Sequence, residues 1–165
     1  MKNKLLLGIT ALVLMIGSFF GGSYFEKQKI KSSPASVISP IQNPTVVEVT
    51  DGDTLKLSDG KTFRLYGVNA PEVKEPFFEE AKAFTQNLVL NKEISFEQEE
   101  NYKVDKFGRE LGYVFIDGVN LNVELVRNGL ARVVLYEKRA KIKYQDELLS
   151  AEKEAREKKL GVWKK

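Results

Sequence analysis

Two Asp-Gly pairs in the first half of the chain constrain its fold more than any other feature. Asp51-Gly52 and Asp59-Gly60 separate three short runs of β-branched or alternating apolar residues, at Val46–Thr50, Thr54–Leu57 and Thr62–Val68. Asp-Gly is a preferred sequence for the tight turn between antiparallel strands, because both residues tolerate a left-handed backbone. The region therefore predicts a meander of three strands.

Three stripes of apolar residues at helical spacing follow the meander. They consist of Phe77, Ala81, Phe84 and Leu88, then Leu121 and Leu125, and last Tyr144, Leu148, Ala151 and Ala155. Such spacing predicts three helices that each bury one face. Asn128-Gly129 is a natural left-handed end for the second helix. In the third helix, Glu152–Arg156 and Glu154–Lys158 are favourable i, i+4 pairs.

Two more runs read as strands, Glu93–Gln98 and Leu111–Ile116, and Leu130–Tyr136 is a further apolar run. The order is then five strands with a helix between the third and the fourth, and helices at the end. This order fits an OB-fold. We therefore predict an α+β protein, a five-stranded β-barrel of the OB-fold type with three helices.

The N-terminal segment differs from the rest of the chain. Lys2 and Lys4 precede the apolar run Leu5–Phe20, which is typical of an export signal. Extended to Phe25 the segment is also long enough to cross a bilayer, since about 20 apolar residues suffice. We expect residues 1–25 to be a signal peptide or an N-terminal membrane anchor rather than a buried soluble helix. The protein is then extracellular, either secreted or anchored to the outer face of the cell membrane.

Residues 26–43 carry Ser, Pro and Lys without any helical or strand period, which predicts a flexible linker before a folded domain at 44–165. The charge divides in the same way. The whole chain has a net charge of +3, but the lysines at 2, 4, 27, 29 and 31 and Glu26 give the N-terminal tail a net +4. The folded part is therefore close to neutral, and the overall positive charge is no evidence that it binds nucleic acid.

The chain contains no His and no Cys. This absence excludes disulfides, zinc and Fe–S sites, thiol nucleophiles, Ser-His-Asp triads and imidazole acid–base chemistry. Catalysis by this chain must use carboxylates, Arg or Lys, hydroxyl groups, or a hard metal ion that is bound through oxygen.

Three clusters carry residues of these kinds: Asp51–Thr54, Arg64–Glu72 and Asp105–Arg109. Taken singly, each has an ordinary reading as a hairpin turn, a strand end or a loop. Taken together, they offer carboxylate and amide oxygens for Ca²⁺, which tolerates irregular oxygen cages. They also offer two guanidinium groups, which are planar forks suited to a phosphate. A metal, two arginines and a carboxylate that activates water are what phosphodiester hydrolysis requires.

In these clusters the sequence resembles the thermonucleases of the staphylococcal-nuclease type, from about Val46 to Trp163. Arg127–Ala131 and Leu160–Trp163 match later segments of that family. The resemblance implies an OB-fold enzyme, a Ca²⁺-dependent endonuclease that hydrolyses phosphodiester bonds of DNA and RNA and leaves 3′-phosphate ends. We expect a monomer whose partner is its nucleic-acid substrate, with membrane contact only through an uncleaved N-terminal segment.

The resemblance also implies roles for single residues. Asp53 matches a Ca²⁺ ligand and Ala70 a position that offers its backbone carbonyl to the metal. Glu72 matches the general base, and Arg64 and Arg109 match the two arginines that bind the scissile phosphate. Near the bound nucleotide, the matching positions are Lys106 and Phe107.

Two positions depart from the family pattern. Asn69 stands where the family has a second metal-binding carboxylate, so the metal site keeps an oxygen ligand but loses one negative charge. We therefore expect weaker Ca²⁺ binding. Tyr136 is an imperfect match to a nucleotide-stacking tyrosine, although both it and Phe107 can stack bases. The alternative for these two aromatic residues is ordinary core packing. The loop after Glu72, Val73–Pro76, is also short.

Other interpretations remain open at this point. Lys138, Arg139, Lys141 and Lys143 could follow a nucleic-acid backbone, but nearby acidic residues favour a solvated charged turn. Asn69 motivates a second function, a non-catalytic OB-fold module that binds single-stranded nucleic acid. A glycosidase with Asp53 and Glu72 as its carboxylate pair is a third, and it leaves both arginines unexplained.

Overall fold

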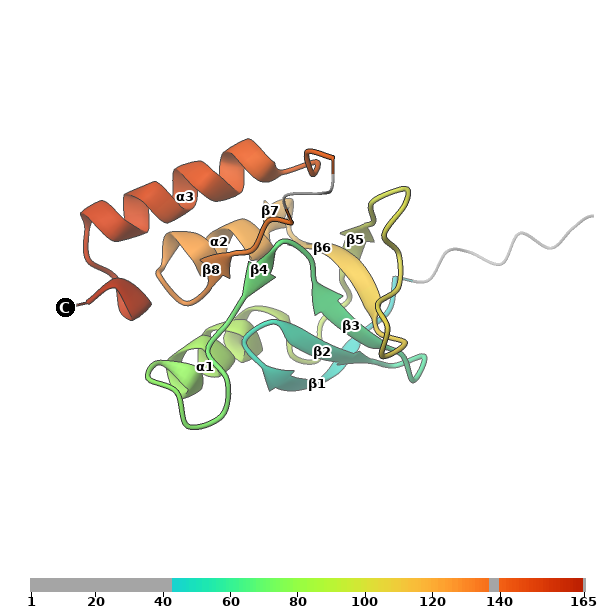
Figure 1. Ribbon diagram of the computed structural model, residues 1–165. Helices are drawn as coiled ribbons and strands as arrows, with labels where there is room; N and C mark the ends of the chain where they lie inside the picture. Colours follow the sequence, from blue (N-terminus) through green and yellow to red (C-terminus); the bar gives the residue numbers. More distant parts are fainter. Residues whose placement is uncertain (1–42, 137–139, 165) are drawn as a thin grey trace, which may run out of the picture. The chain divides into compact units, whose positions relative to one another are not determined.

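The computed structural model describes residues 43–136 and 140–164 (Figure 1). The predicted signal or anchor at 1–25 and almost all of the predicted linker at 26–43 lie outside the described residues, as do Lys138 and Arg139. Among the helices that the structure describes, none combines the length and apolarity needed to cross a membrane.

The described part contains eight strands, three α-helices and a short 3₁₀ helix. The strands are β1 (Val46–Asp51), β2 (Thr54–Leu57), β3 (Thr62–Leu65), β4 (Val68–Asn69), β5 (Ser95–Glu97), β6 (Glu110–Ile116), β7 (Val119–Asn120) and β8 (Arg132–Val133). The helices are α1 (Phe78–Val89), α2 (Leu121–Arg127) and α3 (Gln145–Glu157), followed by η1 (Gly161–Trp163).

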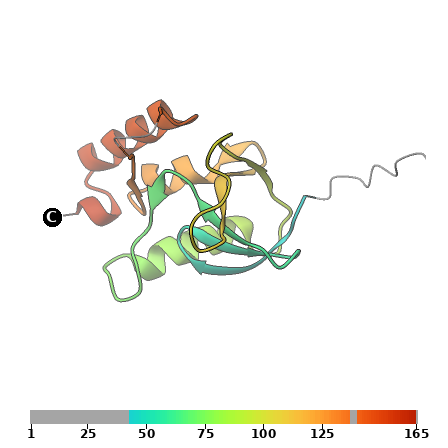
Figure 2. The same ribbon diagram turned by 45° about the vertical axis from the view of Figure 1, so that its right-hand side comes forward.

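Six of the strands form one sheet, in the order β1-β2-β3-β6-β5 with β7 paired to β6. The two edges of this sheet approach each other, because the N–H of Val46 donates to the carbonyl of Lys92 at 3.0 Å and that of Ile94 to the carbonyl of Pro44 at 3.0 Å. The predicted α+β fold of the OB type is therefore confirmed. Figures 1 and 2 show α2 and α3 side by side, and α1 packs against β1.

The third predicted strand is shorter than expected. The run Thr62–Val68 breaks after Leu65, because the chain turns at Gly67, which has a φ of 76°. The strand resumes as β4, which leaves the main sheet and pairs with β8 so that Asn69 faces Arg132. This corner places Arg64 and Asn69 near each other.

The buried face of α1 also differs from the predicted stripe. Its buried residues are Phe78, Ala81, Thr85 and Val89, whereas Phe77, Phe84 and Leu88 are only partly buried. Phe77 lies before the helix with a φ of 70°, so helical geometry begins one residue later than the pattern indicated. The predicted stripe of α3 is confirmed at Leu148, Ala151 and Ala155, and so are both of its ion pairs.

Two buried polar side chains, Asn122 and Thr85, hold the corner between β3 and β4 and the turn before β2. The side-chain amide of Asn122, on α2, donates to the carbonyls of Tyr66 at 2.9 Å and Gly112 at 3.1 Å. The hydroxyl of Thr85 donates to the carbonyl of Gly52 at 2.7 Å. A Cβ atom at Gly52 would lie 2.8 Å from that of Ala81, so only glycine allows this turn to rest directly on α1.

Candidate active site

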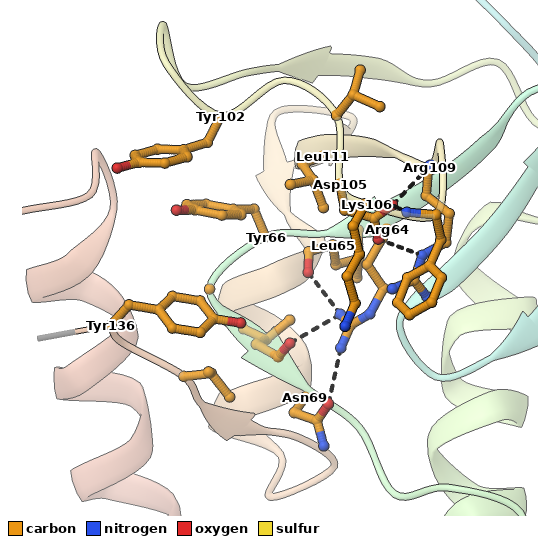
Figure 3. A pocket seen from close by; sticks show the side chains of 15 residues that line it. Arg64, Leu65, Tyr66, Asn69, Tyr102, Asp105, Lys106, Arg109, Leu111 and Tyr136 are labelled. Carbon is orange, nitrogen blue, oxygen red and sulfur yellow. Dashed lines mark hydrogen bonds and ion pairs between the residues drawn. The ribbon is translucent and has the colours of Figure 1, made fainter. Parts of the chain in front are cut away.

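A cavity of about 360 Å³ opens between the β3–β4 corner, the loop that joins β5 to β6, and the chain after β8 (Figure 3). We call it the arginine cavity. It brings together six of the residues predicted from the sequence: Arg64, Asn69, Lys106, Phe107, Arg109 and Tyr136. Asp53 and Glu72 do not line it, so the structure gives no support to a glycosidase that uses this pair of carboxylates there.

Arg64 is held by four groups from neighbouring backbone and side chains. Its Nη1 donates to the carbonyls of Leu65 at 2.7 Å and Val68 at 2.9 Å. Its Nη2 lies 3.0 Å from Oδ1 of Asn69 and 3.0 Å from Oδ2 of Asp53. Strand alternation explains this position, because Phe63 and Leu65 point into the core and leave Arg64 on the opposite face.

Asp53 is almost completely buried, with 4% of its surface exposed. Its Oδ2 accepts the backbone N–H of Ala70 at 2.5 Å as well as the contact from Arg64. Burial raises the pKa of Asp53 to about 7, and the charge of Arg64 and the N–H of Ala70 offset that effect only in part. A carboxylate in this position is thus stabilised in its charged form by any further cation.

The predicted metal ligands can be tested against this geometry. Oδ2 of Asp53 and Oδ1 of Asn69 both lie 3.0 Å from the same nitrogen of Arg64, so the two oxygens lie near each other and are both engaged by this guanidinium. One carboxylate, one amide and a backbone carbonyl are hard oxygen donors of the kind that Ca²⁺ takes. The residues therefore fit a Ca²⁺ site of low charge. Consistent with that low charge, no group of three or more acidic side chains suited to a metal occurs in the described residues.

Arg109 is held differently, by one neighbour in its own loop. Its Nε donates to Oδ2 of Asp105 at 2.7 Å, and Oδ1 of Asp105 accepts the N–H groups of Phe107 and Arg109. Burial opposes the ionisation of Asp105, but these hydrogen bonds outweigh it and hold the pKa of Asp105 below its ordinary value. The loop thus presents Arg109 to the cavity through its own hydrogen bonds.

Phe107 and Tyr136 are both exposed at the cavity, with 71% and 55% of their surfaces accessible. Core packing is therefore excluded for both. Lys106 lies 4.9 Å and Arg109 5.4 Å from the centre of the Phe107 ring, so two cations flank this exposed aromatic side chain.

Two further tyrosines, Tyr66 and Tyr102, line the arginine cavity and were not among the residues predicted from the sequence. Tyr66 and Tyr102 stack with their ring centres 6.2 Å apart. Figure 3 shows Tyr66, Tyr102 and Tyr136 on one side of the cavity and the arginines on the other. Alternation along the predicted run Thr62–Val68 puts Tyr66 on the same face as Arg64, so the sequence could have indicated Tyr66 even though β3 ends at Leu65. No local signal marks Tyr102, which reaches Tyr66 only through the fold.

Glu72 lies on the loop after β4 with its side chain exposed to solvent. Its backbone N–H donates to a carboxylate oxygen of Glu75 at 2.8 Å, and the N–H of Glu75 donates to the carbonyl of Glu72 at 2.8 Å. The loop is thus closed on itself by Glu75, and the carboxylate of Glu72 faces water.

Lys141 and Lys143 are exposed and engage carboxylates. Lys141 pairs with Asp146 at 2.5 Å, and Lys143 pairs with Glu97. These contacts favour the predicted solvated turn over a nucleic-acid surface at the two positions.

Comparison with known proteins shows the family of this chain. The family model for staphylococcal nuclease homologues matches residues 62–165. The chain belongs to that family. It is 36% identical over 131 residues to the thermonuclease of Staphylococcus hyicus, an alignment that covers 74% of this chain and 76% of that protein.

Two further relatives of this staphylococcal nuclease homologue come from Bacillus subtilis (strain 168). The endonuclease YncB is 36% identical over 132 residues, covering 74% of this chain and 62% of the relative. The SPbeta prophage-derived endonuclease YokF is 33% identical over 130 residues, covering 73% of this chain and 44% of the relative. The chain thus spans less than two thirds of either Bacillus protein.

Proposed function

We propose that this chain is a nuclease that uses Ca²⁺ to hydrolyse phosphodiester bonds in DNA and RNA and leaves 3′-phosphate ends. The family and the names of its relatives, a thermonuclease and two endonucleases, support a phosphodiester hydrolase. The observation that carries the proposal is the arginine cavity itself. It sets two guanidinium groups on one side and three tyrosines on the other, which suits a phosphate joined to a base.

In the proposed hydrolysis, Arg64 and Arg109 bind the oxygens of the scissile phosphate. Arg64 is already positioned by the carbonyls of Leu65 and Val68, so it loses little conformational entropy when a phosphate binds. Arg109, on the loop before β6, supplies the second guanidinium group that binds this phosphate. Both guanidinium groups stabilise negative charge that develops on the phosphoryl oxygens.

Asp53, Asn69 and the backbone carbonyl of Ala70 would hold Ca²⁺. When bound, this ion supplies further electrostatic stabilisation of the phosphoryl oxygens. Arg64 contacts the oxygens of both Asp53 and Asn69, so without the ion it compensates the charge of the Asp53 carboxylate.

Glu72 is proposed to take the proton from the attacking water. Its side chain is exposed to solvent, and hydrogen bonds of a general base commonly form only when the substrate is bound. Lys106, Phe107 and Tyr136 are proposed to contact the nucleotide, Phe107 and Tyr136 by stacking.

We also propose that the enzyme is a monomer that acts outside the cell. The basic residues and apolar run at the N-terminus support export, either as a secreted protein or as one anchored by residues 1–25. In that setting Ca²⁺ of the millimolar range is the natural cofactor for a weak site.

A nuclease assay tests the proposal directly. The purified chain is incubated with single-stranded DNA and with RNA, in millimolar Ca²⁺ and in chelator, and the product ends are analysed. We expect cleavage only with Ca²⁺ and products with 3′-phosphates. Glu72→Gln should lower kcat steeply, whereas the matched control Glu80→Gln, on the exposed face of α1, should not.

Asn69 favours a second candidate, a module that binds single-stranded nucleic acid without cutting it. The missing carboxylate weakens the metal site, while both arginines and the three tyrosines of the arginine cavity remain. Salt-sensitive binding of single strands without cleavage at any Ca²⁺ concentration would establish that function in place of the nuclease.

A further inference from the structure

A second cavity, of about 300 Å³, adjoins the arginine cavity, because Asn69 lines both. Its walls come from the loop between β4 and α1, from β8 and from the C-terminal segment. They consist of Asn69, Ala70, Pro71, Glu75, Pro76, Phe77, Arg132, Val162 and Lys164. Two cations and one aromatic ring are thus gathered beside the proposed metal site.

Arg132 is placed there by strand pairing and by the C-terminal tryptophan. It is the direct cross-strand partner of Asn69 in the β4–β8 pair. Its guanidinium lies 4.4 Å from the centre of the Trp163 ring and donates to the carbonyl of Val162 at 3.4 Å. The guanidinium of Arg156 lies 3.9 Å from the centre of the same ring. Trp163 therefore holds Arg132 in position without neutralising it.

Among the described residues, no carboxylate forms an ion pair with Arg132. Within residues 43–136 and 140–164, every other arginine forms an ion pair: Arg64, Arg109, Arg127 and Arg156. Neither Arg132 nor Lys164 has a carboxylate partner in that part of the chain. Two uncompensated cations at the wall of one cavity favour an anionic ligand.

One acidic residue, Glu75, also lines the second cavity. Its carboxylate accepts the backbone N–H of Glu72 at 2.8 Å and is thereby committed to closing the loop. The balance of charge in the lining remains positive.

Phe77 supplies the apolar side of the cavity under backbone strain. It has a φ of 70°, which is rare and costly for a bulky residue. The side chain is only partly buried and lies in the wall with Pro71 and Pro76. Strained residues of this kind cluster at active sites and ligand-binding sites.

We propose that the second cavity binds the nucleotide next to the one in the arginine cavity, with its phosphate on Arg132 and Lys164 and its base or sugar against Phe77. A single strand would then pass from one cavity to the other over Asn69. This inference rests on the proposed nuclease function, because it assumes that the arginine cavity holds the scissile phosphate.

Oligonucleotides of two lengths test the proposal. A thymidine dinucleotide has one phosphodiester, which is bound by Arg64 and Arg109 and leaves no phosphate for Arg132 and Lys164, whereas an octanucleotide supplies phosphates to both cavities. Binding is measured in chelator, by fluorescence anisotropy for the octamer and by chemical-shift titration for the dimer. The variants are Lys164→Gln and Arg132→Gln, and the matched control is Lys153→Gln, an exposed lysine on α3 that lines neither cavity.

We expect each test variant to bind the octamer about fivefold more weakly, as for the removal of one charged group that contacts a phosphate. The slope of log affinity against log salt should become shallower by about 0.7 for each phosphate that the variant no longer neutralises. Binding of the dimer and the control variant should be unchanged. If Arg132→Gln loses its thermal stability because Trp163 is unpacked, Lys164→Gln decides alone.

The inference is overturned if Lys164→Gln binds the octamer with the affinity and salt slope of the control. Cleavage of DNA by the wild-type chain in Ca²⁺ is measured separately. A wild type that cleaves while Lys164→Gln matches the control refutes the second cavity alone. A wild type that does not cleave, together with a length-specific loss in Lys164→Gln, refutes the nuclease and supports the second cavity.

Discussion

The two arginines that line the same side of the arginine cavity are held in different ways. Arg64 contacts two backbone carbonyls, an amide and a buried carboxylate, and only 14% of its side chain is exposed. Arg109 contacts the carboxylate of Asp105 in its own loop, and 31% of its side chain is exposed. Arg64 is therefore held by the barrel, whereas Arg109 is held by its own loop, between β5 and β6.

Arg64 therefore combines a proposed role in phosphate binding with a structural role, whereas Arg109 has few structural contacts. Arg64 compensates the buried Asp53 and joins β3 to β4, so it should contribute to stability as well as to phosphate binding. Arg109 should contribute mainly to phosphate binding, since partly exposed ion pairs add little stability. Four substitutions test this comparison.

Arg64→Ala should have the largest effect. It removes a phosphate-binding cation and leaves the Asp53 carboxylate buried without its charge partner. We expect kcat/KM on single-stranded DNA to fall by about 10³-fold or more and the free energy of unfolding to fall by about 3 kcal/mol. Steady-state kinetics and urea denaturation measure the two quantities.

Arg64→Lys is the matched control for that loss. It keeps one positive charge but cannot reproduce the forked contacts with two carbonyls, Asn69 and Asp53, so both losses should be intermediate. An Arg64→Ala protein that unfolds at the wild-type urea midpoint would show that Arg64 does not hold the corner between β3 and β4.

Arg109→Ala should reduce activity without a comparable loss of stability. Removal of one donor to the phosphoryl oxygens lowers kcat by about 10²- to 10³-fold. The free energy of unfolding should change by less than about 1 kcal/mol, because the Asp105–Arg109 pair is partly exposed. The same two measurements apply. A loss of stability as large as that of Arg64→Ala would remove the distinction between the two arginines.

Much of the fold could be predicted because it depends on local signals. The two Asp-Gly pairs predicted the turns that limit the first two strands. Asn128-Gly129 predicted the end of α2, where Gly129 has a φ of 69°. The apolar spacing of α3 correctly identified its buried face. These features are encoded by neighbouring residues in the chain.

The errors arose where distant contacts decide the structure. Alternation continued through Val68, but the pairing of β4 with β8 pulls the chain out of the sheet at Gly67. The same pairing sets Arg132 opposite Asn69, and no local pattern indicates that contact. Tyr102 likewise enters the arginine cavity only because its loop folds back over Tyr66. The predicted roles of the site residues themselves stay predictions.

Phe107→Ala extends the comparison to the loop that carries Arg109. The ring is 71% exposed, so its removal should leave stability within about 0.5 kcal/mol of wild type. If it stacks on a base, KM should rise by about 5- to 100-fold, because a stacked base contributes about 1–3 kcal/mol. Phe107→Tyr keeps the ring and should restore KM. An unchanged KM in Phe107→Ala would exclude stacking at this position.

Asn69→Asp is expected to have the smallest effect, and it changes a residue that Arg64 contacts. The added carboxylate would lie beside an Arg64 nitrogen that already contacts Asn69 at 3.0 Å, so the fold should accommodate it. It also returns one negative charge to the proposed metal site. We expect Ca²⁺ to bind about tenfold more tightly, because close charge pairs near a protein surface contribute of the order of 1–4 kcal/mol before desolvation is subtracted. Calorimetric titration of Ca²⁺ measures this directly, with thermal stability followed in chelator. Equal Ca²⁺ affinity in the two proteins would place the metal away from Asn69, and the Arg64 corner would then be a phosphate clamp alone.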